Sequence, residues 1–229
     1  MSNKLFPVCV IDDFYTDPYA VKEFALSQKF YPNTDGRWPG ARSKPIDKLD
    51  DSLYHHFCHK ILSIFYDMND ISAYNIESSF QKIKPLHSDK FDKINRGFIH
   101  QDSTFFGGVV YLDVDNEERT GTSIYTTKSK WWYPSKLHNY TDNLKVKSYT
   151  GDKLTNQDIS DWDKSRDSYF ESIKVENVFN RCLLFDGNNH HGVPFFGSSE
   201  RLTQVFFVKN IVFKTEHHPR FPLNKNRVG

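Results

Sequence analysis

The stretch LLFDGNNHHGVP, residues 183–194, joins an apolar run, a small polar turn and two adjacent histidines. The apolar run predicts a buried strand. The Asp, Gly and Asn residues that follow it predict a tight turn. This arrangement would place His190 and His191 just beyond the end of a core strand. Read alone, the pair fits a solvated turn as well as it fits a metal site.

A second candidate site lies at His100-Gln101-Asp102, within an expected strand over residues 97–102. Residues two apart on a strand point to the same face, so His100 and Asp102 would present a ring nitrogen and a carboxylate oxygen side by side. Such donors suit a divalent metal such as Fe(II). The alternative is a capping aspartate beside a structural histidine, and for the tripeptide alone that alternative is favoured.

A third candidate site is Arg201-Leu202-Thr203, at the start of an expected strand over residues 202–213. Alternation would point Arg201 and Thr203 to one face. A guanidinium inside a β-structure is costly unless it meets an anion, and a carboxylate is its natural bidentate partner. Thr203 could donate its hydroxyl to the same carboxylate. The alternative is a surface arginine at the start of a strand.

Five short motifs follow one another in a recognisable order, and they are His100-Gln101-Asp102, Tyr111-Leu112, Gly121-Thr122, His190-His191 and Arg201-Leu202-Thr203. This order resembles the 2-oxoglutarate/Fe(II)-dependent oxygenases, in particular their prolyl-4-hydroxylase-like branch, over residues 97–213. The resemblance implies a double-stranded β-helix, or jelly roll. The block WPGAR at residues 38–42 is reminiscent of an uncharacterised branch of that superfamily.

The resemblance implies that His100, Asp102 and His191 bind Fe(II) and that Arg201, helped by Thr203, binds the distal carboxylate of 2-oxoglutarate. His191 precedes Arg201 by ten residues, from 191 to 201, which is the family's spacing. His190 is the alternative ligand.

Tyr111 is either a further cosubstrate contact or an ordinary core tyrosine. With O₂ as the third cofactor, the implied products are succinate, CO₂ and an oxidised substrate. Since Asp102 fills the carboxylate position at the metal, hydroxylation is expected rather than halogenation.

The remaining pattern predicts an α+β, mainly β fold in a single domain, residues 1–229. An N-terminal part, residues 1–70, would hold a strand over 6–11, a helix from Pro18 to about residue 30 with Asp17 as its N-cap, and a helix over 51–66. A jelly-roll core over 74–213 would contain an insertion over 129–170, with a helical stretch at 158–171. The expected core strands cover residues 74–83, 97–102, 108–114, 122–125, 144–148, 174–179, 182–185 and 202–213.

Composition excludes several classes of protein. Thirty basic and 29 acidic side chains give a formal charge of +1, so no nucleic-acid or membrane partner is expected. There is neither a long apolar run nor a signal-peptide pattern. Cys9, Cys58 and Cys182 are too far apart for a paired metal site or a disulfide scaffold. We therefore expect buried thiols and a cytoplasmic protein.

The sequence leaves the substrate open between a small molecule and a protein side chain. Residues 36–44 and the insertion are expected to border the site. Arg37 and Arg42 would hold an anionic substrate or be solvated loop arginines. The aromatic residues of the insertion are better explained as a packed cover than as a stacking platform, and they are Trp131, Trp132, Tyr133, His138 and Tyr140. Two other classes compete: a cupin-like metal-binding jelly roll without 2-oxoglutarate, and a non-enzymatic binding or structural jelly roll.

Overall fold

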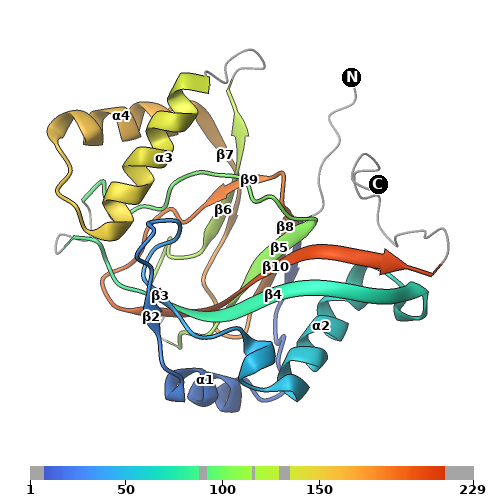
Figure 1. The fold of residues 1–229 in the computed structure, drawn as a ribbon. Helices are drawn as coiled ribbons and strands as arrows, with labels where there is room; N and C mark the ends of the chain where they lie inside the picture. Colours follow the sequence, from blue (N-terminus) through green and yellow to red (C-terminus); the bar gives the residue numbers. More distant parts are fainter. Residues whose placement is uncertain (1–7, 88–91, 115–116, 129–134, 215–229) are drawn as a thin grey trace.

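Two antiparallel β-sheets form most of the structure, a computed structural model that describes residues 8–87, 92–114, 117–128 and 135–214, with residues 135–142 described by backbone alone (Figure 1). The larger sheet has the order β1-β8-β5-β10-β4-β3-β2 and the smaller one the order β7-β6-β9. The strands of the larger sheet are β1 Val8–Ile11, β2 Tyr31–Pro32, β3 Ala41–Arg42, β4 Ile71–Ile83, β5 Phe106–Tyr111, β8 Cys182–Asp186 and β10 Arg201–Phe213. Those of the smaller sheet are β6 Thr122–Thr127, β7 Tyr169–Val175 and β9 His190–Gly192.

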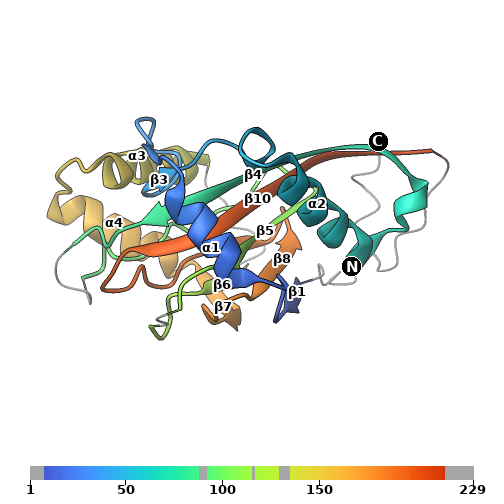
Figure 2. The same cartoon turned by 90° about the horizontal axis from the view of Figure 1, so that it is seen from below.

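Two N-terminal helices, α1 Pro18–Ser27 and α2 Asp51–Phe65, cross the outer face of the larger sheet (Figure 2). Helix α1 begins as predicted, because the side chain of Asp17 accepts a hydrogen bond from the Ala20 amide at 3.0 Å and Pro18 fixes the first turn. Asp50 caps α2 in the same way through the Leu53 amide at 2.9 Å. Two short 3₁₀ turns, Ile46–Lys48 and Met68–Asp70, flank α2.

The main core lies between these helices and the larger sheet. Helix α2 buries one stripe of side chains that includes Phe57, Ile61 and Phe65. Phe57 meets Phe206 of β10 edge-to-face, with the ring centroids 5.0 Å apart. Full burial of each such side chain contributes about 1.5–3 kcal/mol, so this layer anchors β10 and β4 firmly. The inner face of the larger sheet is thereby left free to meet the smaller one.

A second core joins the two sheets, and it consists of Val109, Tyr111, Ile124, Val175, Leu183 and Phe185. A third, smaller cluster holds α3 Ser135–Thr150 and α4 Asn156–Arg166 against the segment before His100. There the Trp162 ring stacks on Phe98 with the centroids 4.3 Å apart and an interplanar angle of 7°. These two helices lie together beside the smaller sheet (Figure 1).

Most predicted elements are confirmed, including the mainly β character and the two N-terminal helices. Several boundaries move: α1 ends at Ser27, α4 spans Asn156–Arg166, and β7 covers Tyr169–Val175 instead of residues 174–179. The predicted strand over 6–11 is described from Val8 onward.

Two predicted strands are wrong. Residues 144–148 belong to helix α3, since Leu144 and Ser148 are buried while Val146 between them is 40% exposed, a helical rather than an alternating pattern. Residues 97–102 form only an isolated bridge at His100. Gly97, His100 and Asp102 donate to the carbonyls of Val193, His191 and Gly187. These partners do not advance in step along the chain, so no regular ladder forms.

None of the helices in the described part of the chain is both long enough and apolar enough to cross a membrane. All three cysteines carry free thiols, with Cys58 and Cys182 buried and Cys9 half-buried.

Candidate functional site: a His-Asp-His cluster in a basic cavity

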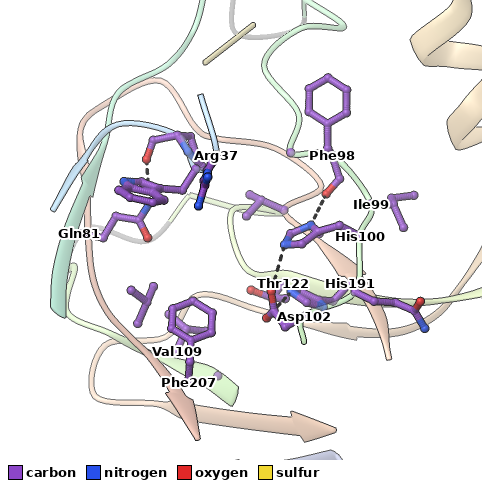
Figure 3. Close-up of a pocket in the computed structure, with 18 of the residues that line it drawn as sticks. Arg37, Gln81, Phe98, Ile99, His100, Asp102, Val109, Thr122, His191 and Phe207 are labelled. Atoms are coloured by element: carbon purple, nitrogen blue, oxygen red, sulfur yellow. Dashed lines mark hydrogen bonds and ion pairs between the residues drawn. The ribbon is translucent and has the colours of Figure 1, made fainter. Parts of the chain in front are cut away.

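The three residues predicted to bind metal converge on one point (Figure 3). His191 lies on β9, and His100 faces it from the neighbouring segment through an antiparallel bridge. Paired residues of a bridge project to the same face, and Asp102, two residues beyond His100, joins them there. One ligand atom from each residue lies within 4.8 Å of the others. The two imidazole rings are 4.4 Å apart between centroids.

Hydrogen bonds fix the tautomer of both histidines. The Nδ1 atom of His100 lies 2.9 Å from the Phe98 carbonyl, and that of His191 lies 3.0 Å from the Asn189 carbonyl. A carbonyl oxygen only accepts, so each Nδ1 carries the proton and each Nε2 presents a lone pair. This is the arrangement that orients metal-binding histidines in proteins.

Both Nε2 atoms face the carboxylate of Asp102. His100 Nε2 is 3.7 Å from Oδ1, and His191 Nε2 is 3.4 Å from Oδ2. Enclosure in the protein lowers the pKa of His100 well below its ordinary value, and repulsion from His191 and Lys145 lowers it further, so His100 is neutral at pH 7. A lone pair and a carboxylate that face one another need a cation between them. The donor set therefore fits a divalent metal with two imidazoles and one carboxylate.

His190 faces the opposite way. It pairs with Tyr125 of β6, and its ring contacts Tyr169 with the centroids 5.1 Å apart. The cluster includes His191 and not its neighbour. The geometry thus favours His191 in the pair that the sequence left open, and its ligand role stays a prediction.

Close backbone packing holds the Asp102 segment against the loop before β9. The Asp102 amide donates to the Gly187 carbonyl at 2.9 Å. A Cβ atom on Gly187 would lie 2.3 Å from the Thr104 carbonyl oxygen and 2.9 Å from that of Asp102. Only glycine fits this position without displacing the segment that contains Asp102. The Asp186-Gly187 turn therefore helps to position the site.

The cluster opens into a cavity of about 1040 Å³. This volume lies at the upper end of the range for small-molecule sites. Strands of the larger sheet form one wall, where Gln81 and Phe207 are labelled, and the metal-binding candidates occupy the opposite side (Figure 3). Phe98, Val193 and Phe185 add apolar surface.

Arg201 and Thr203 both line this cavity. Arg201 is 5% exposed, and its Nη1 donates to the Thr120 carbonyl. Its Nε has no hydrogen-bond partner, and no ion pair to Arg201 occurs among the described residues. Burial lowers the pKa of Arg201, while Tyr111 and Asp113 raise it. Arg201 is thus a buried cation whose charge is not neutralised by a direct partner in the described part of the chain.

Thr203 also has a buried donor without a hydrogen-bond partner in the described part of the chain, in this case a neutral hydroxyl. The residue is 1% exposed, and its hydroxyl has no hydrogen-bond partner among the described residues. A buried donor without an acceptor costs about 1–3 kcal/mol, so two of them on one wall indicate that an acceptor belongs there. A carboxylate would satisfy the guanidinium and the hydroxyl together.

Tyr111 lies behind the cavity wall. It is fully buried, its hydroxyl donates to Thr122 Oγ1 at 2.9 Å, and the Arg201 guanidinium carbon is 5.9 Å from its ring centroid. Burial raises the pKa of Tyr111 to about 12, so the phenol stays protonated. Thr122 lines the cavity and Tyr111 does not. The direct cosubstrate contact predicted for Tyr111 stays a prediction, and its observed neighbours are Thr122 and Arg201.

Helices α3 and α4 both border the cavity, α3 through Lys145 and Tyr149 and α4 through Ser165. Arg166 donates to the Gly97 carbonyl at 2.6 Å and to the Tyr125 hydroxyl at 3.2 Å. Among the insertion aromatics, Trp131, Trp132 and Tyr133 lie outside the described residues, and His138 and Tyr140 lie where only the backbone of α3 is described.

Gln81 is among the cavity residues that the sequence did not indicate. Gln81 is 3% exposed and stands on β4 between Arg42 and Thr203 of the neighbouring strands. Its chain neighbours are Phe80 and Lys82, and no local pattern marks Gln81 as a cavity residue.

Comparison with known proteins gives a family and a fold. The family model described as "Family of unknown function (DUF6445)" matches residues 1–196. No curated protein matches the chain in sequence.

Among solved structures, a similar fold occurs in HygX from Streptomyces hygroscopicus with nickel, 2-oxoglutarate and hygromycin B bound. The TM-score is 0.54 and the sequence identity is 10%, and the match covers 90% of this chain and 84% of that chain. HygX with nickel and 2-oxoglutarate bound has a TM-score of 0.52 and 11% identity, with the same shares of 90% and 84% covered. The resemblance drawn from the motifs is confirmed at the level of the fold.

Proposed function

Since the chain belongs to the family of unknown function DUF6445 and shares its fold with HygX, we propose that it is an Fe(II)- and 2-oxoglutarate-dependent oxygenase. The two sheets then correspond to the two halves of a double-stranded β-helix, with α1 and α2 supporting the larger one. The reaction is the hydroxylation of a small molecule or of a protein side chain.

His100, Asp102 and His191 are the proposed iron ligands. Two imidazoles and one carboxylate on one side of a metal leave three adjacent positions open, which a chelating cosubstrate and O₂ require. The Nδ1 bonds to the Phe98 and Asn189 carbonyls keep each Nε2 directed at the metal position. Bound there, Fe(II) with 2-oxoglutarate and O₂ would supply the oxidising chemistry, releasing succinate and CO₂.

Arg201 is the proposed partner of the distal carboxylate of 2-oxoglutarate, with Thr203 as a second donor. The observation that carries the whole proposal is this pair of buried, unsatisfied donors on the same cavity as the His-Asp-His cluster. Tyr111 holds the Thr122 hydroxyl and packs beside the guanidinium, so it supports this wall from behind.

The two alternatives account for fewer of these features. A cupin-like metal protein without 2-oxoglutarate would use the cluster but have no need for a buried Arg201. A non-enzymatic jelly roll would need neither the converging ligands nor the aligned tautomers. Because Asp102 completes the carboxylate position, a halide has no vacant place at the metal, and hydroxylation is favoured over halogenation.

The deciding experiment is anaerobic titration of 2-oxoglutarate into Fe(II)-loaded protein, followed through the visible charge-transfer absorption of the chelate. We expect one equivalent of iron, a saturable band, and succinate once O₂ is admitted. Asp102→Ala should lose both the iron and the band. Iron binding without any band would favour the cupin-like alternative, and no iron binding at all would favour the non-enzymatic one.

A further inference from the structure

The cavity has a second cationic group, Arg42, on the wall away from Arg201. Arg42 pairs with Gln81 of β4, and Gln81 pairs with Thr203 of β10. Directly paired residues face the same side of a sheet, so these three side chains form one row across three strands. All three line the cavity.

Aromatic rings hold Arg42 in place. Its guanidinium carbon lies 4.4 Å from the Trp38 ring centroid and 5.4 Å from that of Phe207. Gln81 fixes the arrangement, since its Nε2 donates to the Pro39 carbonyl at 2.7 Å and its Oε1 accepts from Arg42 Nη2 at 3.5 Å. Stacking of this kind orients a guanidinium without neutralising it.

Arg42 has no direct counter-ion within the described ranges. Its Nε lacks a hydrogen-bond partner, and so does the indole Nε1 of Trp38 beside it. The acidic groups that act on Arg42 are Asp102, which belongs to the metal cluster, and Glu77, which is ion-paired with Lys209 at 3.5 Å. Burial lowers the pKa of Arg42 to about 10, so the guanidinium still carries its charge at neutral pH.

The net charge of the cavity's lining residues also favours the binding of an anion. Among its described lining residues, five are basic (Arg37, Arg42, Lys145, Arg201 and Lys209) and two are acidic (Glu77 and Asp102). This leaves an excess of three positive charges. A divalent metal and a doubly charged 2-oxoglutarate would cancel each other, so the excess would persist in the loaded site. An enclosed excess of this size attracts anions.

We propose that Arg42, clamped between Trp38 and Phe207 and backed by Gln81, binds an anionic group of the substrate, a carboxylate or a phosphate with two oxygens available to one guanidinium. This inference rests on the proposed function, because only then is the bound molecule a substrate. The two carboxylates of 2-oxoglutarate are already assigned to the metal and to Arg201. The anion at Arg42 therefore belongs to a different molecule, one whose remaining body lies between Arg42 and the metal.

The test uses matched pairs of probes and needs neither metal nor 2-oxoglutarate. N-acetylated amino acids are titrated into the metal-free protein beside their neutral amides, and phosphate monoesters beside the parent alcohols, with binding followed by ligand-observed NMR. We expect the anionic member of at least one pair to bind tenfold or more tightly than its neutral partner. The pair that shows the preference identifies the anion as carboxylate or phosphate.

Variants then locate the anion. Arg42→Gln should reduce the preference about tenfold or more, and Arg42→Lys should keep part of it, since lysine retains the charge but not the two-pronged geometry. Arg37→Gln is the matched control, because it removes one charge from an exposed residue of the same cavity and should change the preference less than twofold.

No preference in any pair, an unchanged preference in Arg42→Gln, or a loss confined to Arg201→Ala would overturn the proposal. Equal losses in Arg42→Gln and Arg37→Gln would overturn it too, since the preference for the anion would then come from the net charge of the cavity and not from a contact with Arg42. If Arg42→Gln does not fold, Arg42→Lys decides, and an undiminished preference there would count against the two-pronged contact. A protein that passes these titrations but forms no succinate would contradict the proposed oxygenase function and leave Arg42 as the binding group for an anion that is not an oxygenase substrate.

Discussion

His100 and His191 exchange both backbone hydrogen bonds of a single bridge, with the amide of each donating to the carbonyl of the other at 3.0 Å and 2.9 Å. The bridge holds the two imidazoles side by side before any metal binds. It also means that the ligand geometry depends on two segments of backbone and not on side-chain packing alone.

Replacing each of the two neighbouring histidines, His190 and His191, should have a different effect on iron binding. His191→Ala removes a group of the cluster and should abolish tight Fe(II) binding, whereas His190→Ala, whose ring points toward Tyr169, should leave it measurable. Anaerobic calorimetric titration with Fe(II) measures both, with circular dichroism as the control for folding. The reverse result would mean that His190 is the distal ligand.

Arg201→Ala should weaken 2-oxoglutarate binding about thirtyfold or more. Removing one partner of a buried charged pair costs about 2–5 kcal/mol, and 1.4 kcal/mol corresponds to tenfold. Thr203→Val should cost less, because one neutral hydrogen bond is worth about 0.5–1.5 kcal/mol. Charge-transfer titration of the Fe(II) protein measures both dissociation constants. Arg42→Gln is the control and should leave the 2-oxoglutarate constant unchanged; a loss there instead of in Arg201→Ala would exchange the roles of the two arginines.

Gly187→Ala should weaken metal binding, although Gly187 is not a proposed metal ligand. The added methyl group would meet the Thr104 carbonyl at 2.3 Å, so the Asp102 segment has to shift. We expect Fe(II) affinity to fall tenfold or more. Gly151→Ala is the matched control: its positive φ of 84° costs about 1 kcal/mol of stability, but the methyl group meets nothing within 4 Å. Equal metal affinity in the two variants would show that the close approach at Gly187 does not matter.

Protonation of Asp158 at low pH should remove a stabilising contribution at the start of helix α4. The Thr155 amide and hydroxyl donate to its carboxylate and lower its pKa below the ordinary value. A lowered pKa in the folded state stabilises the protein above the unfolded-state pKa of about 3.9, and this contribution is lost as the pH falls through the folded-state value. Asp158→Asn should therefore destabilise the protein at pH 7 and make little difference near pH 2. Urea unfolding of both proteins at the two pH values measures this, and an equal difference at both would contradict it.

The sequence predicted which three side chains converge better than it predicted the elements that hold them. His100, Asp102 and His191 were chosen for residue type, order and spacing, which survive an error in secondary structure. The strand expected over residues 97–102 failed because its pairing depends on the distant 187–193 segment, which no local pattern reveals. The strand expected over residues 144–148 failed because the alternation of Leu144 and Val146 with two lysines is too short to distinguish a strand from part of a helix. Gln81 was missed because its meaning arises only across strands, between Arg42 and Thr203.

The cluster of Phe98, Leu144 and Trp162 is the smallest of the three hydrophobic clusters among the described residues. Fewer buried apolar side chains secure α3 and α4 than secure β4 and β10, so local unfolding should begin in these helices, and their amides should exchange with solvent hydrogen first. The Phe98 carbonyl also holds Nδ1 of His100. Phe98 thus links the helices with the fewest buried apolar side chains to the orientation of a proposed metal ligand, because its ring stacks on Trp162 and its carbonyl accepts from His100 Nδ1.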